Sequence, residues 1–311
     1  MLHSPAVMHI PDGFLSLGVS LTCWLVTISV LALALKRINR NFNERQIPLM
    51  GVMAAFIFAA QMINFPVAGG TSGHLLGGTL ASILLGPWAA ILVMTAVVAV
   101  QGLLFQDGGL LAMGANILNM GLLTVILSYG LTRMVQGRSR STRLVMAGFA
   151  AWLAVMTGAL ATSLQLWLSG TASLGMVVPA MLGVHALIGM GEAVITVTTL
   201  AFILRTRPDL LEQGTRPTGS LGWMLAGLSI SLLVVILSPL ASVYPDGLER
   251  VALQLGFFYS AQTAKFKFLP NYTLPFLGRN PVSTILAGLL GLIIVTGLVM
   301  FLARRLRKKE K

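Results

Sequence analysis

Long apolar runs constrain this chain more than any other feature of its sequence. A helix needs about 20 mostly apolar residues to cross the roughly 30 Å hydrocarbon core of a bilayer. Nine such runs, bounded by charged residues, glycine or proline, lie near 13–35, 47–65, 70–86, 88–106, 109–132, 144–168, 176–204, 220–243 and 283–303. We therefore predict an all-α polytopic membrane protein, a helical bundle of about nine transmembrane helices.

The run at 70–86 is the shortest of these and is rich in glycine. It ends at Gly86-Pro87, a pair that breaks or kinks helices because proline lacks an amide N–H and clashes with the preceding turn. The pair therefore either separates two helices or bends one longer element.

The basic residues indicate the orientation of the chain. Only 10% of the 311 residues are charged, against roughly 25% in soluble domains, although the net charge is +12. In a membrane protein, lysine and arginine collect in cytoplasmic loops. An outside N-terminus and a cytoplasmic C-terminus place four basic clusters inside, at 36–45, 133–143, 205–216 and 304–311. The positive charge is thus explained by topology, and no nucleic-acid partner is expected.

The few polar groups inside apolar runs are the candidates for chemistry, because ionisable groups are costly in hydrocarbon. The four histidines are His3, His9, His74 and His185, and Glu192 is the one carboxylate well inside a predicted helix. Nitrogen donors suit nickel, cobalt, copper and zinc better than magnesium or calcium. The single cysteine, Cys23, excludes a disulfide framework within the chain and a site of several cysteines.

Several sequence blocks resemble one transporter family. MHIPDGFLS from Met8 and GGTSGHLLGG from Gly69 are similar to signatures of the cobalt and nickel substrate-binding components of energy-coupling factor (ECF) transporters, the CbiM/NikM family. LLGPWAA at 84–90, GANILNMG at 114–121 and HALIGMGEA at 185–193 extend the resemblance over about 8–205. YPDGLE at 244–249 resembles a PDGLE-type, NikN-like accessory component. The resemblance implies a fusion of the two components.

These boundaries divide the chain into four parts. Residues 8–205 form the expected metal-binding unit of seven helices, and 220–311 form a two-helix accessory domain. The polar segment 206–219, with its prolines and glycines, is the expected cytoplasmic linker. Residues 1–7 are an N-terminal extension. The family motif begins at the initiating methionine, so we expect translation to start at Met8 or the extension to be removed.

The resemblance also implies the metal ligands. In this family an N-terminal Met-His pair and a histidine of a glycine-rich loop bind the ion, and the matching residues here are Met8, His9 and His74. The amine of Met8, the amide and imidazole of His9 and the imidazole of His74 would supply four nitrogens. A planar set of four nitrogens suits nickel(II), and cobalt(II) also uses such donors. The metal would be transported cargo, and no catalytic cofactor is expected.

Three other features have two interpretations each. Asn116 and Asn119 either brace the metal loop or hold helices together. His185 and Glu192 lie seven residues apart and share a helical face, which favours a structural polar pair over a direct ligand. Gly51, Ala55 and Ala59 form a stripe of small residues, suited either to a docking partner or to internal packing.

The predicted function is that of the substrate-binding component of an ATP-driven uptake transporter in the cytoplasmic (inner) membrane. The sequence has no G-x-x-x-x-G-K-[ST] phosphate loop, so hydrolysis would occur in partners. The resemblance implies a transmembrane coupling component carrying two cytosolic ABC ATPases. The alternative is a secondary transporter or channel, for which intramembrane acidic relays or inverted repeats would be expected. A hydrolase built on Ser72 and His185 lacks the G-x-S-x-G spacing, so we do not expect an enzyme.

Overall fold

Long apolar helices form the body of the protein. The computed structural model describes residues 9–41, 46–207, 222–262, 266 and 268–306. Seven helical segments of the described chain are long and apolar enough to span a membrane: Leu17–Ile38, Pro87–Phe105, Met113–Arg133, Arg140–Leu168, Leu174–Thr206, Gly222–Leu240 and Pro281–Leu306. The predicted helical, polytopic membrane fold is confirmed. The predicted sidedness of the termini stays a prediction.

The elements follow one another in a simple order. The helices are α1 (Leu17–Asn41), α2 (Gln46–Gln61), α3 (Gly78–Leu85), α4 (Pro87–Val100), α5 (Met113–Asn116), α6 (Thr124–Arg133), α7 (Arg140–Leu168), α8 (Leu174–Thr206), α9 (Gly222–Leu237), α10 (Gly247–Leu255) and α11 (Pro281–Leu306). Two π-helical turns, η1 (Gln101–Phe105) and η2 (Ile117–Leu123), continue α4 and α5. Such turns are often found near functional sites.

The predicted third helix, at 70–86, is wrong over half its length. The chain here forms a hairpin of β1 (Phe65–Val67) and β2 (Thr71–Gly73), runs without regular structure over 74–77, and only then enters α3. With eight residues, α3 is about 12 Å long, too short to cross a bilayer. Gly86 has φ +75° and Pro87 begins α4, so this pair separates two helices.

Backbone that is not helical must find its hydrogen-bond partners within the protein when it lies inside a membrane protein. The extended segment after β2 finds them in the side chains of two other helices, α2 and α8. Glu192 accepts from the N–H groups of Leu76 and Gly77, at 2.6 and 2.9 Å, and Gln61 donates to the Leu76 carbonyl at 2.8 Å. These contacts make an irregular segment tolerable where the sequence suggested a helix.

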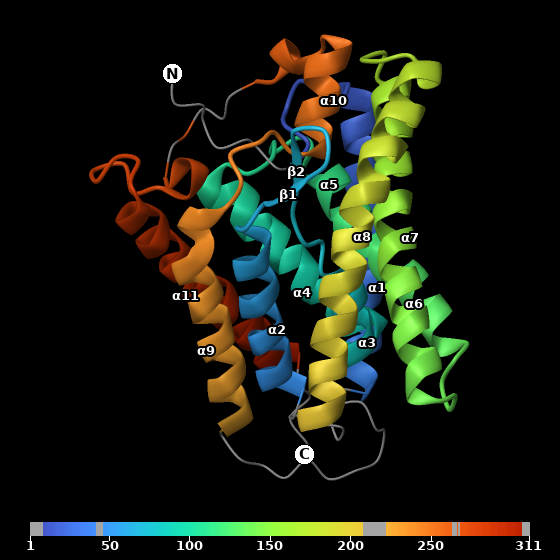
Figure 1. The fold of residues 1–311 in the computed structure, drawn as a ribbon, viewed down its shortest axis with the longest axis vertical. Coiled ribbons are helices and arrows are strands. Elements are labelled where there is room, and N and C mark those ends of the chain that lie inside the picture. The colour runs from blue at the N-terminus through green and yellow to red at the C-terminus, as the bar shows by residue number, and fades with distance from the viewer. Residues whose placement is uncertain (1–8, 42–45, 208–221, 263–265, 267, 307–311) are drawn as a thin grey trace.

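The C-terminal part packs along α2 and over one end of the bundle. Figure 1 shows α9 and α11 beside α2, and α10 across the end that carries the hairpin. Gly51 meets Met300 of α11, and Ala55 and Ala59 are fully buried. The stripe of small residues on α2 therefore serves internal packing. The predicted linker, 206–219, lies almost entirely outside the described residues.

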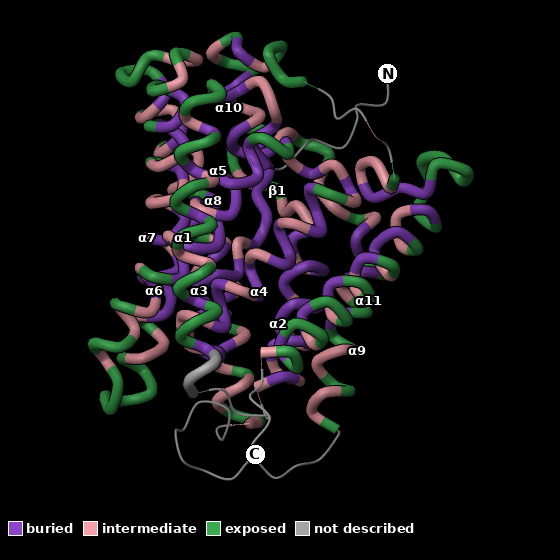
Figure 2. The backbone as a smooth tube through the Cα atoms, turned by 180° about the vertical axis from the view of Figure 1, so that it is seen from behind, coloured by how far each residue is buried: buried purple, intermediate pink, exposed green. Residues whose placement is uncertain are grey.

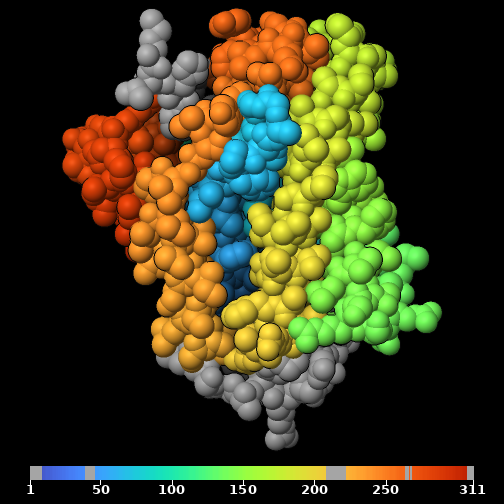
Figure 3. Space-filling view, viewed as in Figure 1, coloured from blue at the N-terminus to red at the C-terminus, as the bar shows by residue number. Residues whose placement is uncertain are grey.

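Helices α2, α3 and α4 are the most buried, and burial decreases towards the outer helices, as Figure 2 shows. Helices α1, α7, α8, α9 and α11 expose large apolar side chains on their outer faces, as expected of a lipid-facing surface. In Figure 3 the hairpin is seated between α8 and the C-terminal part. Gly73, the last residue of this hairpin, lines the cavity of the candidate site.

Candidate metal centre

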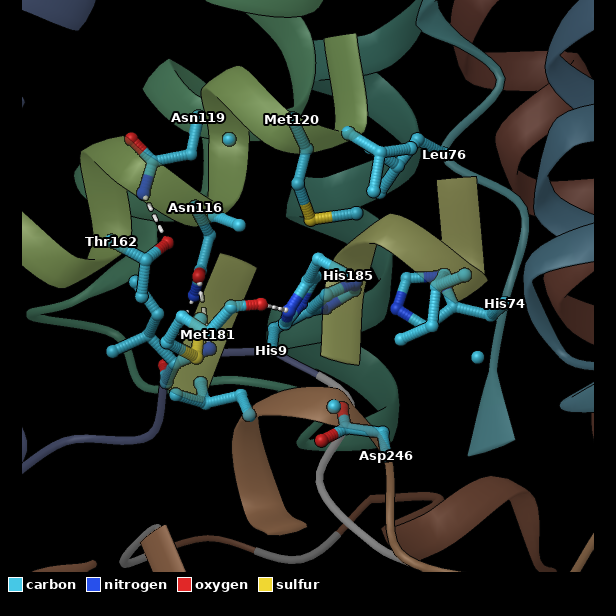
Figure 4. A pocket seen from close by; sticks show the side chains of 18 residues that line it. His9, His74, Leu76, Asn116, Asn119, Met120, Thr162, Met181, His185 and Asp246 are labelled. Carbon is cyan, nitrogen blue, oxygen red and sulfur yellow. Dashed lines mark hydrogen bonds between the residues drawn. The ribbon is translucent and has the colours of Figure 1, made fainter. Parts of the chain in front are cut away.

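A cavity of about 80 Å³ lies where the N-terminal segment, the strand before His74, η2, α7, α8 and the loop before α10 meet. In Figure 4, His9, His74 and His185 lie on one side of it, and Asn116, Asn119 and Thr162 on the other. Three of the four histidines of the sequence therefore line one space, although they are far apart along the chain.

His9 is held by the loop that follows η1. It is 2% exposed, and its Nδ1 lies 2.9 Å from the carbonyl oxygen of Asp107 and 3.4 Å from Asp107 Oδ1. The carbonyl can only accept, so this contact assigns the proton of a neutral ring to Nδ1. Nε2 is buried and has no hydrogen-bond partner. Its lone pair is the kind of donor that a metal ion uses.

The backbone beside His9 is fixed by Asn116. Its side-chain oxygen accepts from the Ile10 N–H, and its amide donates to the Ile10 carbonyl, both at 3.0 Å. Gly108, with φ +106°, faces His9 so closely that an added Cβ would lie 2.9 Å from the His9 Cβ. Glycine at this position lets the loop approach the histidine. Asn116 therefore braces the segment that carries His9, and its role in metal binding stays a prediction.

Asp12 completes the attachment of the N-terminal segment. Its carboxylate accepts from the N–H groups of Leu110 and Ala112, each at 3.0 Å, at the start of α5. The Gly109 N–H donates to the Ile10 carbonyl at 2.9 Å. Loop 107–112 therefore grips residues 9–12 through both side chains and backbone.

His74 follows β2 and faces His9. The two ring centroids are 5.7 Å apart with the rings nearly perpendicular, and His74 is 8% exposed. Its Nδ1 lies 3.1 Å from the Leu75 carbonyl, which again assigns the proton of a neutral ring to Nδ1. The two residues predicted as imidazole ligands are thus brought together.

His185 and Glu192 do not form the expected polar pair. His185 Nδ1 lies 2.8 Å from the Met181 carbonyl, one turn back on α8, while Glu192 holds the backbone after His74. His185 lines the cavity, and Glu192 has a structural position. Asn119 exchanges two 2.8 Å hydrogen bonds with Gln165 and one of 3.1 Å with Thr162, so it joins η2 to α7.

The PDGLE loop covers the cavity, a role that the sequence did not reveal. Ser72 bonds through its N–H and hydroxyl to the carbonyls of Pro245 and Tyr244, both at 2.8 Å. Asp246 caps α10 by accepting from the Glu249 N–H at 2.7 Å. Burial, and to a lesser extent the charges of Glu249 and Asp107, raises the pKa of Asp246 well above its usual range. Gly247 packs against His185, leaving no room for a Cβ.

The side chains alone do not make a complete metal site. Among the residues that the structure describes, no three or more His, Cys, Asp or Glu side chains form a group that could hold a metal ion. Met8, the third predicted ligand, lies outside the described residues. Two imidazoles converge, and any further donors must come from elsewhere in the chain or from solvent.

Fold and site together define a class: a polytopic helical membrane protein with a small cavity lined by imidazoles and covered at one end by a C-terminal unit. The sequence identifies the family. Residues 9–210 match the family described as the cobalt uptake substrate-specific transmembrane region, CbiM, and residues 221–308 match the PDGLE domain. The chain belongs to the CbiM family and carries a fused PDGLE domain, which confirms the predicted resemblance.

Individual relatives agree with this assignment. The putative fused nickel transport protein NikMN of Archaeoglobus fulgidus is 36% identical over 96% of this chain and 99% of its own length. The cobalt transport protein CbiM of Sorangium cellulosum is 32% identical over 66% of this chain and 95% of its own length. A crystal structure of a truncated transition metal transporter has a TM-score of 0.58 and 33% identity, covering 64% of this chain and 99% of that chain.

Proposed function

We propose that this chain captures nickel(II) as the substrate-binding component of an ATP-driven uptake transporter, with cobalt(II) as the other candidate cargo. The observation that carries the proposal is the convergence of two buried imidazoles, those of His9 and His74, at one cavity, with ring centroids 5.7 Å apart. Neutral imidazole is the commonest side-chain ligand of metal ions. Membership of a metal-uptake family supports a metal ion as the ligand of this cavity.

The proposed ligands are Met8, His9 and His74, with Asn116 and His185 in supporting positions. Two imidazoles leave a four-coordinate ion short of donors, and the amine of Met8 and the amide of His9 would supply the rest. This requires Met8 to carry a free amine, as it would if residues 1–7 are absent from the mature chain. Sequencing the N-terminus of the natively expressed protein tests that requirement.

Binding of the ion by both the amide and the imidazole of His9 would also require the imidazole ring to move. Only Nδ1 closes a six-membered ring with the amide nitrogen of the same residue, and Nδ1 is engaged by the Asp107 carbonyl in this structure. We propose that the His9 ring turns about its Cβ–Cγ bond as the ion binds.

Nickel binding to the purified full-length protein tests the ligand assignment. His9→Ala and His74→Ala should each weaken nickel affinity at least about 100-fold, since each removes a direct donor. His185→Ala should have a smaller effect, within about 10-fold, as expected for a neighbour of the ligands. Parent-like affinity in the His9→Ala, His74→Ala double variant would remove the proposed site.

Metal uptake distinguishes the two transport classes. The family membership supports a substrate-binding component that depends on a coupling protein and two ATPases. Proteoliposomes containing this chain alone, with a proton gradient and no ATP, should therefore take up no nickel. Uptake by the isolated chain under those conditions would support the alternative, a secondary transporter.

A further inference from the structure

A chain of hydrogen bonds connects the C-terminal unit to His9. The Tyr272 hydroxyl donates to Asp107 Oδ2 at 2.8 Å, and the backbone and side chain of Asp107 face His9 Nδ1 at 2.9 and 3.4 Å. The three residues are 7%, 4% and 2% exposed. Tyr272 and His9 are 263 positions apart in the sequence, so the connection exists only in the folded protein.

Tyr272 is fixed against the segment that carries Asp107. Its ring stacks on Phe105, with centroids 4.6 Å apart and planes 15° from parallel. Nearby, the Leu269 N–H donates to the Leu104 carbonyl at 3.0 Å. The segment 269–272 of the C-terminal unit therefore contacts segment 104–107 through a backbone bond, a ring stack and a side-chain bond.

Unusual backbone conformations lie on both sides of this contact. Asn271 and Tyr272 have φ of +53° and +55°, and Gln106, next to Asp107, has φ of +60°. Residues other than glycine adopt such angles uncommonly, asparagine more readily than tyrosine or glutamine, and strained positions concentrate at functional sites. The π-helical turn η1 ends at Phe105, immediately before Gln106. Uncommon backbone angles therefore lie next to both contacts, that of Asp107 with His9 and that of Tyr272 with Asp107.

We propose that Tyr272 is a positioning residue for the metal site: it braces Asp107, which holds the His9-bearing segment, so that the C-terminal unit completes the site. This inference rests on the proposed role of His9 as a ligand. Loop 107–112 holds residues 9–12 through Ile10 and Asp12, and these contacts do not involve the His9 ring. A loose Asp107 would loosen that attachment and displace its negative charge from the bound cation.

The test is nickel affinity of the full-length protein in four variants. Tyr272→Phe keeps the ring and its stacking on Phe105 and removes only the hydroxyl. Asp107→Ala removes the carboxylate that Tyr272 braces, and the double variant completes a cycle. Tyr259→Phe, the same change at an 89% exposed tyrosine of the same unit, is the control.

Tyr272→Phe should weaken nickel binding about 3- to 10-fold, and Asp107→Ala about 10- to 100-fold, the range for residues that support metal ligands. Tyr259→Phe should match the parent. In the Asp107→Ala background, Tyr272→Phe should cost less than about 2-fold, because its target is already absent. This loss of effect is the readout that a general structural role would not produce.

Three results would overturn the inference: unchanged or tighter binding in Tyr272→Phe, an equal cost of Tyr272→Phe with and without Asp107, or an equal effect of Tyr259→Phe. The single comparison of Tyr272→Phe with Tyr259→Phe decides the matter if Asp107→Ala does not fold. Failure of the proposed function is separate and is detected by parent-like binding in His9→Ala.

Discussion

The side-chain amide of Asn116 satisfies both the N–H and the carbonyl of Ile10, the residue that follows His9. A side-chain amide donates and accepts at neighbouring atoms without any change of protonation. These two hydrogen bonds tie the end of α5 to the N-terminal segment. The position of His9 therefore depends on a residue more than 100 positions later in the chain.

Asn116→Ala should weaken nickel binding about 10- to 100-fold, because it leaves two buried backbone groups of Ile10 without partners and loosens the segment next to His9. Asn119→Ala is the matched comparison. It removes bonds between η2 and α7, and should lower the melting temperature more than the affinity. Titration of both variants with nickel checks this, and equal losses of affinity would contradict it.

Glu192→Gln should destabilise the protein by about 1–3 kcal/mol, the cost of leaving a buried donor unsatisfied. The carboxylate accepts from two N–H groups after His74, whereas glutamine offers one oxygen and places an NH₂ group against the second donor. Thermal unfolding of the purified, metal-free protein measures the effect. An unchanged melting temperature would show that the segment at 74–77 does not need Glu192.

These contacts explain which parts of the fold followed from sequence. Long helices such as α7 and α11 are predicted by local apolar composition, which depends on no distant partner. The segment 74–77 is not a helix because Gln61 and Glu192, the latter more than 110 positions later in the chain, satisfy its extended backbone. Local composition carries no signal for such partners.

The candidate site, like the fold, could be predicted from the sequence only in part. His9 and His74 belong to sequence blocks of a known family, and the structure brings their rings together. In the sequence, neither Asp107 nor Tyr272 belongs to a pattern that predicts a role in the site. Their roles depend on the φ angles and on contacts between segments 165 positions apart, which periodicity does not encode.

The protonation of His9 is measurable before and after metal binding. In the metal-free protein, ¹⁵N NMR of labelled histidine should show a proton on Nδ1, since the Asp107 carbonyl accepts from it, and none on Nε2. If nickel binds through the His9 amide and imidazole, Nδ1 should become metal-bound and Nε2 protonated. A proton that stays on Nδ1 in the nickel-loaded protein would exclude the chelate.

Two glycines of α11 test how the C-terminal unit is attached. At Gly291 a Cβ would overlap the ring of Phe58 on α2, whereas at Gly297 nothing lies within 4 Å of an added Cβ. Gly291→Val should therefore force α11 away from α2 and destabilise the protein by about 1–3 kcal/mol or more, the usual cost of overpacking.

Gly297→Ala should be neutral within about 0.5 kcal/mol, or slightly stabilising, because alanine favours the helix and meets open space. Thermal unfolding of both variants gives the stability. Because α11 helps to hold the C-terminal unit, and Tyr272 in that unit bonds to Asp107, Gly291→Val should also weaken nickel binding. A destabilised Gly291→Val protein with parent-like nickel affinity would show that the metal site is independent of how α11 packs against α2.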